Sequence, residues 1–484
     1  MKTHVWALLI LISLGLACTE SDLRSSDDHM IDPAVLDGIF SDFAGSNGPG
    51  CAFAVSQAGQ VIVTRAYGSA NLEHDIQNTP ETVFEPGSVS KQFTAAVIAL
   101  LAEEGTVDLD ENIREYFPEI RRYAQPITVR HLVHHTSGLR DIYTLMSLAG
   151  IRLEDVFTDE QAIELIAAQR ETNFAPGSEY LYSNSGYFLL AQLVERASGK
   201  TLREFAEERI FAPLGMEDTH FHDRPSHIVD RRAISYQDSD VDFDNYIATG
   251  HREFQVSYLG NFDKVGAGGL YTTVRDLLLW DRNFYSGDVG GRPFLDLIHT
   301  RGALNDGSQL TYAFGLTVDE YRGLKTVSHG GSMMGFKAAY LQFPEQRLSV
   351  ITTCNLGSIN PMPLAQQVAD VYLGDQLARA VPSSTTMRRS NSSTASEPFA
   401  NDEIVGLAGT FYSDELDVSY ELAVENGQLW LRLRNTPPRL LRKLEDGLAR
   451  AGTWNLTFEH DVGEIASAFT INAGRVTNIR FKRR

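Results

Sequence analysis

The sequence predicts a mixed α/β protein followed by a smaller all-β unit, and three observations lead to this division. Strand-like runs stand near both ends of the first 377 residues, and patterns typical of buried helices lie between them. Residues 380–398 are rich in Ser, Thr and Arg, as linkers are. Beyond residue 401, short runs alternate between apolar and polar side chains, which is typical of half-buried strands.

The first 17 residues have the layout of an export signal. Lys2 supplies the positive charge, and the apolar run over 5–16 is too short to cross a membrane. Because Cys18 directly follows Ala17, we expect a bacterial lipoprotein signal in which Cys18 becomes lipidated, with a polar tether after it. The predicted location is the cell envelope, in the periplasm and anchored to the membrane. Ordinary cleavage after Ala17, giving a secreted protein, is the alternative.

Charge and length limit the classes of partner. The chain has 484 residues, enough for two or three domains, and a formal net charge of −21. This charge argues against nucleic acid and against anionic lipid surfaces as partners of the whole molecule. Residues 401–484 contain 11 basic and 12 acidic side chains, so nearly all of the negative charge belongs to the preceding region.

A predicted hairpin and a predicted buried helix introduce the first candidate site. Residues 51–56 and 61–66 flank a turn, and the apolar run over 93–101 follows the helix-breaking pair Pro86-Gly87. A helix beginning near Ser88 places Lys91 beside it on one face. A buried lysine loses its proton readily, and a helix N-terminus stabilises an oxyanion. The pattern indicates a nucleophile and its base, although Ser-x-x-Lys alone occurs often by chance.

Several histidines invite a metal interpretation, which the spacing does not favour. His131, His134 and His135 have helical spacing, but no Glu lies between them and no third ligand is evident. His220 and His222 are interpreted as a detail of a loop. We therefore predict structural histidines, no metal site and no cofactor.

A tyrosine-rich loop supplies the second candidate. The turn at Pro176-Gly177 leads into a polar stretch, and an apolar helix is expected over 188–197. The phenol of Tyr182 and the carboxamide of Asn184 could both point into a cleft, since loops held by rigid elements often carry function. A surface loop without a function is the open alternative.

The third candidate is the glycine-rich stretch over 327–336. It predicts a short strand that contains His329 and Ser332, and in which glycines such as Gly331 allow another backbone or a ligand to come close. Two further strands are expected over 337–343 and 347–353. Backbone N–H groups of such a strand could lie along a substrate.

Together, Ser88-x-x-Lys91, Tyr182-x-Asn184 and His329-x-Gly331 resemble the three signature elements of the serine β-lactamase and penicillin-recognising superfamily. The likeness is greatest to the class C-like branch, which includes class C β-lactamases, D,D-peptidases, esterases and D-aminopeptidases. It covers about residues 33–377. It implies an antiparallel sheet flanked by helices, with the active site between that sheet and a helical region.

The resemblance also implies a role for each candidate. Ser88 would attack a carbonyl and form an acyl-enzyme, while Lys91 and Tyr182 would activate it and move its proton. Asn184 would bind the acyl-side amide of the substrate or orient Lys91. The backbone N–H groups of Ser88 and Ser332 would form the oxyanion hole. This set requires no metal.

One departure from the family pattern concerns substrate choice. Many β-lactamases and D,D-peptidases have a lysine in place of His329, and that cation attracts a carboxylate. An unperturbed histidine is mostly neutral at pH 7 and gains charge below about pH 6.5. We therefore expect an exported serine hydrolase, an esterase or a D-aminopeptidase-like peptidase, acting on a small molecule or peptide. The alternatives are a penicillin-binding D,D-peptidase or β-lactamase, and an envelope-binding lipoprotein with a vestigial site.

Two thiols remain after the leader. From the residues alone, Cys51 and Cys354 either pair or serve as small buried hydrophobes. The resemblance implies that they begin the first strand and end the last strand of one sheet, on neighbouring antiparallel strands. We expect proximity rather than a disulfide, because bridge geometry is demanding.

The C-terminal region is expected to form a small antiparallel barrel. Strands are predicted at 407–412, 420–425, 428–434, 453–459, 466–471 and 476–481. The first of these runs resembles the opening of the lipocalin-like modules attached to some superfamily members. The predicted division is a signal peptide (1–17), a tether (18–32), a hydrolase domain (33–377), a linker (378–400) and a lipocalin-like β-barrel (401–484).

Overall fold

The structure is a computed structural model, and it describes residues 31–43, 48–239, 254–257, 262–378, 399–444, 448–460 and 465–484. The predicted signal peptide, Cys18, most of the tether and linker residues 379–398 lie outside these ranges. Among the helices of the described residues, none has the length and apolar character needed to cross a membrane.

A six-stranded antiparallel sheet forms the centre of the larger domain. Its strand order is β2-β1-β12-β11-β10-β9, so the first and last strands of the domain are neighbours. Their bounds are β1 Cys51–Gln57, β2 Gln60–Tyr67, β9 Thr317–Tyr321, β10 Leu324–Met333, β11 Phe336–Phe343 and β12 Leu348–Cys354. The mixed α/β fold with an antiparallel sheet is confirmed.

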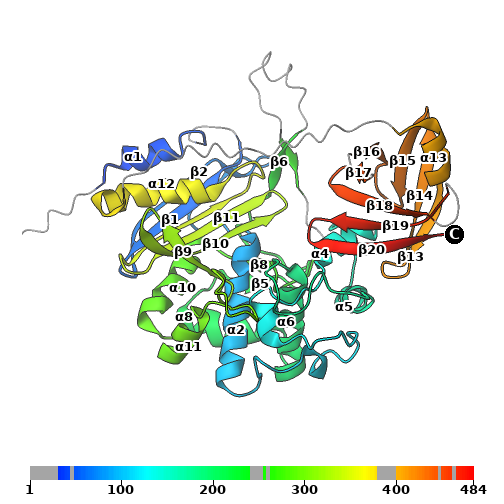
Figure 1. The fold of residues 1–484 in the computed structure, drawn as a ribbon. Coiled ribbons are helices and arrows are strands. Elements are labelled where there is room, and N and C mark those ends of the chain that lie inside the picture. Colours follow the sequence, from blue (N-terminus) through cyan, green and yellow to red (C-terminus); the bar gives the residue numbers. More distant parts are fainter. Residues whose placement is uncertain are drawn as a thin grey trace, which may run out of the picture.

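Helices cover both faces of this sheet (Figure 1). On one face lie α1 (Pro33–Ile39) and α12 (Pro361–Leu373), packed on a core of their own. The other face carries a larger core that includes α2 (Lys91–Glu103), α6 (Asn184–Ser198), α10 (Val274–Ser286) and α11 (Gly291–Ile298). Helix α2 is buried on every side from Lys91 to Leu101, as its apolar run predicts.

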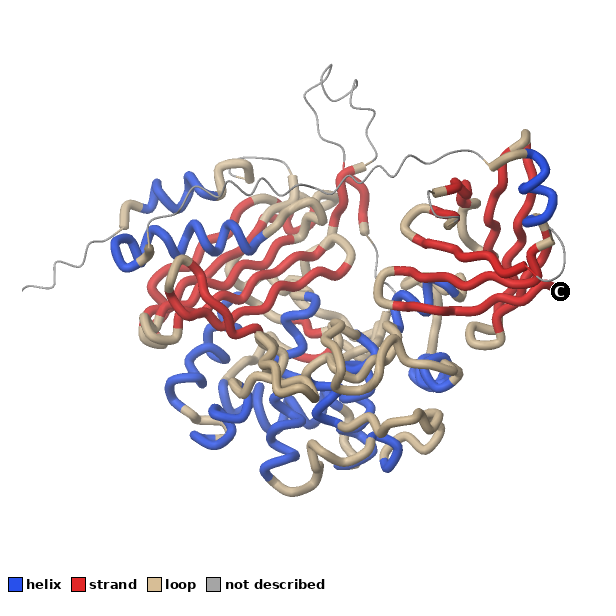
Figure 2. The backbone as a smooth tube through the Cα atoms, viewed as in Figure 1, coloured by secondary structure: helices blue, strands red, loops and turns tan. Residues whose placement is uncertain are grey.

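Shorter elements connect these parts, with loops over much of the helical side (Figure 2). They are β3 Ser69–Asn71, β4 Ile76–Gln77, η1 Gly87–Ser90, η2 Ile113–Glu115, α3 Val129–Val133, α4 Ile142–Leu148, α5 Asp159–Ala167, α7 Leu202–Ala206, η3 Glu207–Phe211, α8 Ala212–Leu214, β5 His220–Phe221, β6 Tyr236–Asp238, β7 Phe254–Val256, β8 Leu270–Tyr271, η4 Gly374–Gln376 and α13 Asn401–Leu407.

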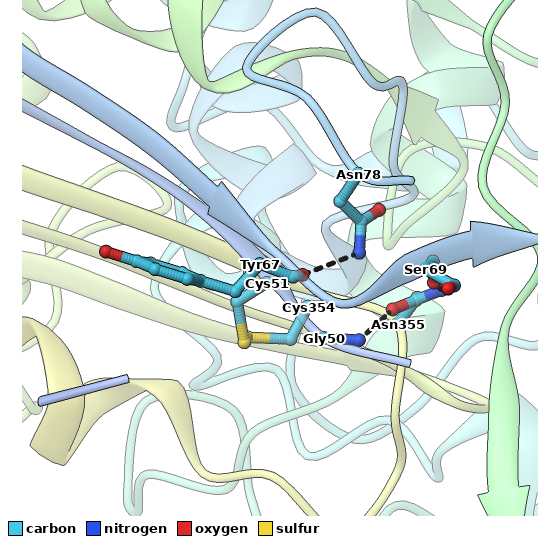
Figure 3. The surroundings of a disulfide bond; sticks show 7 residues. All are labelled: Gly50, Cys51, Tyr67, Ser69, Asn78, Cys354 and Asn355. Carbon is cyan, nitrogen blue, oxygen red and sulfur yellow. Dashed lines mark hydrogen bonds between the residues drawn. A yellow bond between two sulfur atoms is a disulfide. The ribbon is translucent and has the colours of Figure 1, made fainter. Parts of the chain in front are cut away.

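A disulfide joins the first and last strands of the sheet. Cys51 on β1 stands directly opposite Cys354 on β12, and their Cα atoms are 4.0 Å apart. Figure 3 shows the bond, with Gly50 N donating to Asn355 Oδ1 (2.8 Å) beside it. The expected proximity is confirmed. The expectation that no disulfide forms is wrong, because the register places the two side chains opposite each other on one face of the sheet.

The C-terminal domain is a closed eight-stranded barrel. Its strands are β13 Gly409–Ser413, β14 Val418–Glu425, β15 Gln428–Leu433, β16 Arg439–Lys443, β17 Ala449–Ala451, β18 Trp454–His460, β19 Ala466–Ala473 and β20 Val476–Arg483. Alternate side chains fill its apolar interior. The predicted small barrel is confirmed, and the short strands β16 and β17 were not predicted.

The barrel packs directly on the larger domain, next to α4 (Figure 1). Leu145 and Leu148 of α4 belong to the hydrophobic core of the barrel. Arg140 forms an ion pair with Glu415 (2.6 Å) in which both side chains are buried. The hydroxyl of Tyr420 donates to the Leu148 carbonyl (2.6 Å). The interface therefore combines an apolar core with buried hydrogen bonds and a buried ion pair.

Candidate active site

The three sequence motifs meet in one open cleft of about 530 Å³ between strand β10 of the sheet and the helical region. Every predicted site residue of the larger domain except Lys91 lines this cleft: Ser88, Tyr182, Asn184, His329, Gly331 and Ser332. Lys91 lies beneath it, fully buried, and contacts both Ser88 and Asn184. The folded chain thus brings together side chains that are far apart in the sequence.

The pair Ser88 and Lys91 stands at the start of the buried helix. Ser88 lies in the 3₁₀ turn η1, and Lys91 is the first residue of α2. Lys91 Nζ is 3.2 Å from Ser88 Oγ, 3.0 Å from Asn184 Oδ1 and 2.5 Å from the Ala267 carbonyl oxygen. Burial without water lowers the pKa of Lys91 to about 7. A substantial fraction of this amine is therefore neutral at pH 7 and able to accept a proton.

The turn that carries Ser88 is held by a buried carboxyl group. Glu85 accepts hydrogen bonds from the N–H groups of Gly87 (3.1 Å) and Gly269 (2.8 Å). Burial raises the pKa of Glu85 to about 7, even though these two bonds favour its charged form. Ser90 Oγ adds a bond to the Gly87 carbonyl (2.6 Å). Glu85 was not predicted as a site residue, and its role here is to shape the turn.

Two glycines allow strand β10 to pack against this turn. A Cβ atom at Gly331 would lie 1.7 Å from the Pro86 carbonyl oxygen, which is an impossible contact. A Cβ atom at Gly87, whose φ is +57°, would lie 2.4 Å from Ser332 N. The absence of these side chains places the backbone of Ser332 beside the Ser88 turn, where an oxyanion hole of two N–H groups requires it.

Asn184 is oriented by Asp141, which was not predicted as a site residue. Asp141 caps the N-terminus of α4, and its Oδ2 accepts from both the backbone N and the Nδ2 of Asn184, each at 2.8 Å. Because Nδ2 donates to Asp141, Oδ1 is left to face Lys91. This geometry favours the expected role of Asn184 in orienting Lys91. An aspartate before the apolar run 142–148 is a helix-cap signal that could have identified Asp141.

Tyr182 lies over Lys91 with its ring. Lys91 Nζ is 4.8 Å from the ring centroid, and His135 packs on the same ring at 4.1 Å between centroids. The buried hydroxyl has no hydrogen-bond partner in the described part of the chain. Burial raises the pKa of Tyr182 well above its usual range, and the neighbouring Ser88 only partly offsets this rise. The phenol is therefore a proton donor at neutral pH.

His329 is a neutral residue with both ring nitrogens engaged. Its Nδ1 faces the Gly330 carbonyl oxygen (2.6 Å) and must carry the proton, so Nε2 accepts from the hydroxyl of Tyr312 (3.1 Å). Burial, and to a lesser degree the charge of Lys91, lower the pKa of His329 to about 4. The expectation that His329 gains charge below about pH 6.5 is wrong, because desolvation keeps the ring neutral to much lower pH.

An arginine from the barrel also lines the cleft. Arg475 lies in the β19–β20 turn, with its guanidinium carbon 4.8 Å from the Tyr182 ring centroid. Its Nη1 is 3.8 Å from Asp141 Oδ2. The local sequence around residue 475 predicts a hairpin turn and nothing more, since the contact depends on how the two domains pack.

Of the other histidines, His135 supports the loop that carries Tyr182 and Asn184, whereas His220, His222 and His227 lie away from the cleft. His135 Nδ1 accepts from Ser183 N (3.1 Å), which fixes the loop before Asn184. Within the described ranges, one group of three side chains could hold a metal ion, formed by His220, His222 and His227, with ligand atoms within 4.8 Å of one another. His220 and His222 were predicted to be a detail of a loop, but His220 lies on the short strand β5 and His222 directly follows it. None of the three lines the Ser88 cleft.

The chain matches the Beta-lactamase family over residues 36–370, and it therefore belongs to this family of serine hydrolases. It is 29% identical to a D-aminopeptidase of Gluconobacter oxydans over 326 residues, which are 66% of this chain and 58% of the relative. It is 31% identical to a D-aminopeptidase of Brucella anthropi over 308 residues, 64% of this chain and 56% of the relative. The aligned region thus spans less than two thirds of these relatives.

Solved structures share the fold. An octameric penicillin-binding protein homologue from Pyrococcus abyssi aligns with 93% of this chain and 99% of its own, at a TM-score of 0.61 and 21% identity. A D-amino acid amidase from Ochrobactrum anthropi SV3 aligns with 70% of this chain and 97% of its own, at a TM-score of 0.57 and 24% identity. At these identities the likeness shows the fold alone.

Proposed function

We propose that the chain hydrolyses an ester or amide bond through an acyl-enzyme on Ser88. One observation carries this proposal: a buried lysine with a pKa of about 7 lies 3.2 Å from the hydroxyl of a serine that faces an open cleft. Such an arrangement activates a weak nucleophile at neutral pH.

In the acylation step, the neutral amine of Lys91 takes the proton of Ser88 Oγ. The oxygen forms a bond to the substrate carbonyl carbon, and the carbonyl π electrons move onto its oxygen. The backbone N–H groups of Ser88 and Ser332 then stabilise this oxyanion. Donors fixed before the reaction stabilise the charge only as it develops, so they accelerate the chemical step.

In the collapse of the tetrahedral intermediate, the carbonyl re-forms and the bond to the alcohol or amine breaks. The leaving group receives a proton from the phenol of Tyr182, which is protonated at neutral pH, and Tyr182 recovers it from the Lys91 ammonium. Water then attacks the acyl-serine ester, with Lys91 again accepting the proton. The carboxylic acid product leaves and Ser88 regains its hydrogen.

The substrate class follows from the relatives and from His329. The D-aminopeptidase relatives and the neutral His329 support an esterase or a D-aminopeptidase-like peptidase over a β-lactamase. A penicillin-binding D,D-peptidase or β-lactamase is the second candidate, supported by the fold shared with the Pyrococcus abyssi homologue. A non-catalytic envelope lipoprotein is the third.

We place the protein in the cell envelope, attached through a lipid on Cys18. The leader pattern over residues 1–17 supports this location. The disulfide between Cys51 and Cys354 adds support, because such bonds persist mainly in oxidising compartments outside the cytosol.

The test is intact-mass analysis after incubation with a fluorophosphonate, and parallel assays with p-nitrophenyl esters, D-amino-acid amides and penicillin. We expect a single fluorophosphonate adduct on the wild type and none on Ser88→Ala. Hydrolysis of esters or D-amino-acid amides should exceed that of penicillin. Labelling that persists in Ser88→Ala would refute the acyl-enzyme, and no labelling of the wild type would favour the non-catalytic lipoprotein.

A further inference from the structure

The cleft has a charged group that neither the motifs nor the family match assigns. Of the described residues that line it, Arg475 is the one with an ionic side chain, and it comes from the C-terminal barrel. The side chain is 43% exposed, so its guanidinium is accessible to a molecule in the cleft. A guanidinium presents five N–H donors in a planar fork that matches a carboxylate.

Arg475 is held in place by its backbone. It occupies the second position of a two-residue turn, between the paired residues Ala473 and Val476. Its carbonyl oxygen accepts from Asn173 Nδ2 (2.9 Å) and Asp141 N (3.4 Å) of the larger domain. On the other side of Asn173, Oδ1 accepts from the backbone N of Thr477 (3.0 Å). The turn is therefore docked on the larger domain, and Figure 1 shows the β19–β20 hairpin beside that domain, near α4.

The guanidinium itself keeps donors for a ligand. No side chain of the described residues accepts a hydrogen bond from it, since Asp141 Oδ2 is 3.8 Å away. That oxygen already accepts two bonds from Asn184, and Asp141 is 2% exposed. The guanidinium also lies over the face of Tyr182, at 4.8 Å from the ring centroid. The exposed guanidinium of Arg475 thus presents a positive charge to the cleft, while the carboxylate of Asp141 is buried below it.

The charge of Arg475 also reaches the reacting groups. It is among the causes that lower the pKa of Lys91, after burial and against Asp141. It likewise opposes the rise in the pKa of Tyr182. The guanidinium therefore acts electrostatically on two side chains that would move protons in the proposed reaction.

We infer that Arg475 of the barrel binds a carboxylate of the substrate, so that the enzyme selects esters or amides bearing an anionic group close to the scissile bond. This inference rests on the proposed function. Arg475 would supply, from a different wall of the cleft, the positive charge that the neutral His329 lacks. Because a protonated amine in the same position would be repelled, the inference favours the esterase branch of the proposed function over the D-aminopeptidase-like branch.

A matched pair of esters tests the inference. The probes are p-nitrophenyl butyrate, which is neutral, and the mono-p-nitrophenyl ester of glutaric acid, which carries a carboxylate. The variants are Arg475→Gln, Arg475→Lys and the control Arg480→Gln. Arg480 lies on β20, pairs with Glu459 and lines no part of the cleft, so its replacement changes the net charge equally.

The readout is the ratio of kcat/KM for the anionic ester to that for the neutral ester at pH 7.5. Effects on Lys91 cancel in this ratio because both esters use the same base. We expect Arg475→Gln to lower the ratio about fivefold, at the upper end of the range for a partly exposed charge pair. Arg475→Lys should retain most of the ratio and Arg480→Gln all of it. An unchanged ratio in Arg475→Gln, or equal losses in Arg475→Gln and Arg475→Lys, would overturn the inference.

The experiment distinguishes a failure of the proposed function from a failure of the inference about Arg475. In that case wild-type hydrolysis of both esters would equal that of Ser88→Ala. The inference then still has a test, because calorimetric binding of the glutarate ester to Ser88→Ala does not need turnover. Adding Arg475→Gln to Ser88→Ala should weaken this binding about fivefold, and unchanged binding would overturn the inference.

Discussion

At the scale of residues, the cleft depends on a lysine that is neutral near pH 7. Lys91 has no access to water, and three oxygen atoms surround its amine. Burial outweighs the carboxylates of Asp141 and Glu85, which act in the opposite direction on its pKa. The protonation state of this single amine is therefore the main control on the reactivity of Ser88.

This leads to a prediction about pH. The base must be unprotonated, so kcat/KM for a neutral ester should rise with pH through an apparent pKa of about 7, set by Lys91. His329 should add no step between pH 5.5 and 8.5, because its pKa is about 4. Lys91→Ala should lower kcat by roughly 10²–10⁴-fold and remove the rising limb. His329→Gln is the control, and loss of the limb in that variant would contradict the assignment to Lys91.

At the scale of elements, the closest approach in the site is that of strand β10 to the turn η1. At Gly331 and Gly87 the backbone of one element packs directly against the backbone of the other, and there is no space for a Cβ atom between them. The neighbouring Gly330 differs, because a Cβ atom there would meet nothing closer than the Ala338 carbonyl oxygen at 3.9 Å. Two adjacent glycines of one strand thus have different tolerances for a methyl group.

The prediction from this contrast is that Gly331→Ala moves β10 away from Ser88 and misplaces the oxyanion donor. A displacement of about 1 Å at a catalytic group costs on the order of 10²-fold in kcat. Gly330→Ala should have a much smaller effect. Kinetics of both variants, with far-UV circular dichroism to verify folding, provide the measurement. Equal losses of kcat would mean that the packing of β10 on η1 does not position the donor.

The elements also show what the sequence could and could not predict. The helix after Ser88 and the strands around His329 follow from apolar runs and glycines, and both are confirmed. Helix α6 begins at Asn184, earlier than the predicted residue 188, because Asp141 accepts from its first N–H group and stabilises the start from outside the local sequence. Strands β16 and β17 escaped prediction since they are short, and Pro437-Pro438 precedes the first of them.

At the scale of the whole molecule, the site belongs to two domains. Motif spacing predicted the residues of the larger domain, but no local pattern indicates that a barrel turn contacts Tyr182. That contact depends on the interface around the buried ion pair of Arg140 and Glu415, which also accepts from Arg170 N (2.7 Å). Arg140 and Glu415 are 275 residues apart in the sequence, so their pairing depends on how the two domains pack and cannot be predicted from a local pattern.

The ion pair gives a prediction about stability. Glu415→Ala leaves the guanidinium of Arg140 buried without its partner, which costs about 3–5 kcal/mol. The adjacent pair of Arg170 and Asp414 is half exposed, so Asp414→Ala should cost no more than about 1 kcal/mol. Urea denaturation followed by fluorescence gives both values. Similar values for the two variants would show that the interface is not a main source of stability.

The disulfide has a consequence for a chain that has been cut by a protease. Cys51 and Cys354 are 303 residues apart, so nearly the whole larger domain lies inside one covalent ring. A single cut within that ring leaves the two pieces linked, and the nicked protein runs as one species until a reductant is added. A cut after residue 354 has a different outcome, because the barrel is then held by noncovalent contacts alone. After the first kind of cut all residues of the cleft remain covalently linked, whereas after the second kind the barrel can dissociate together with Arg475.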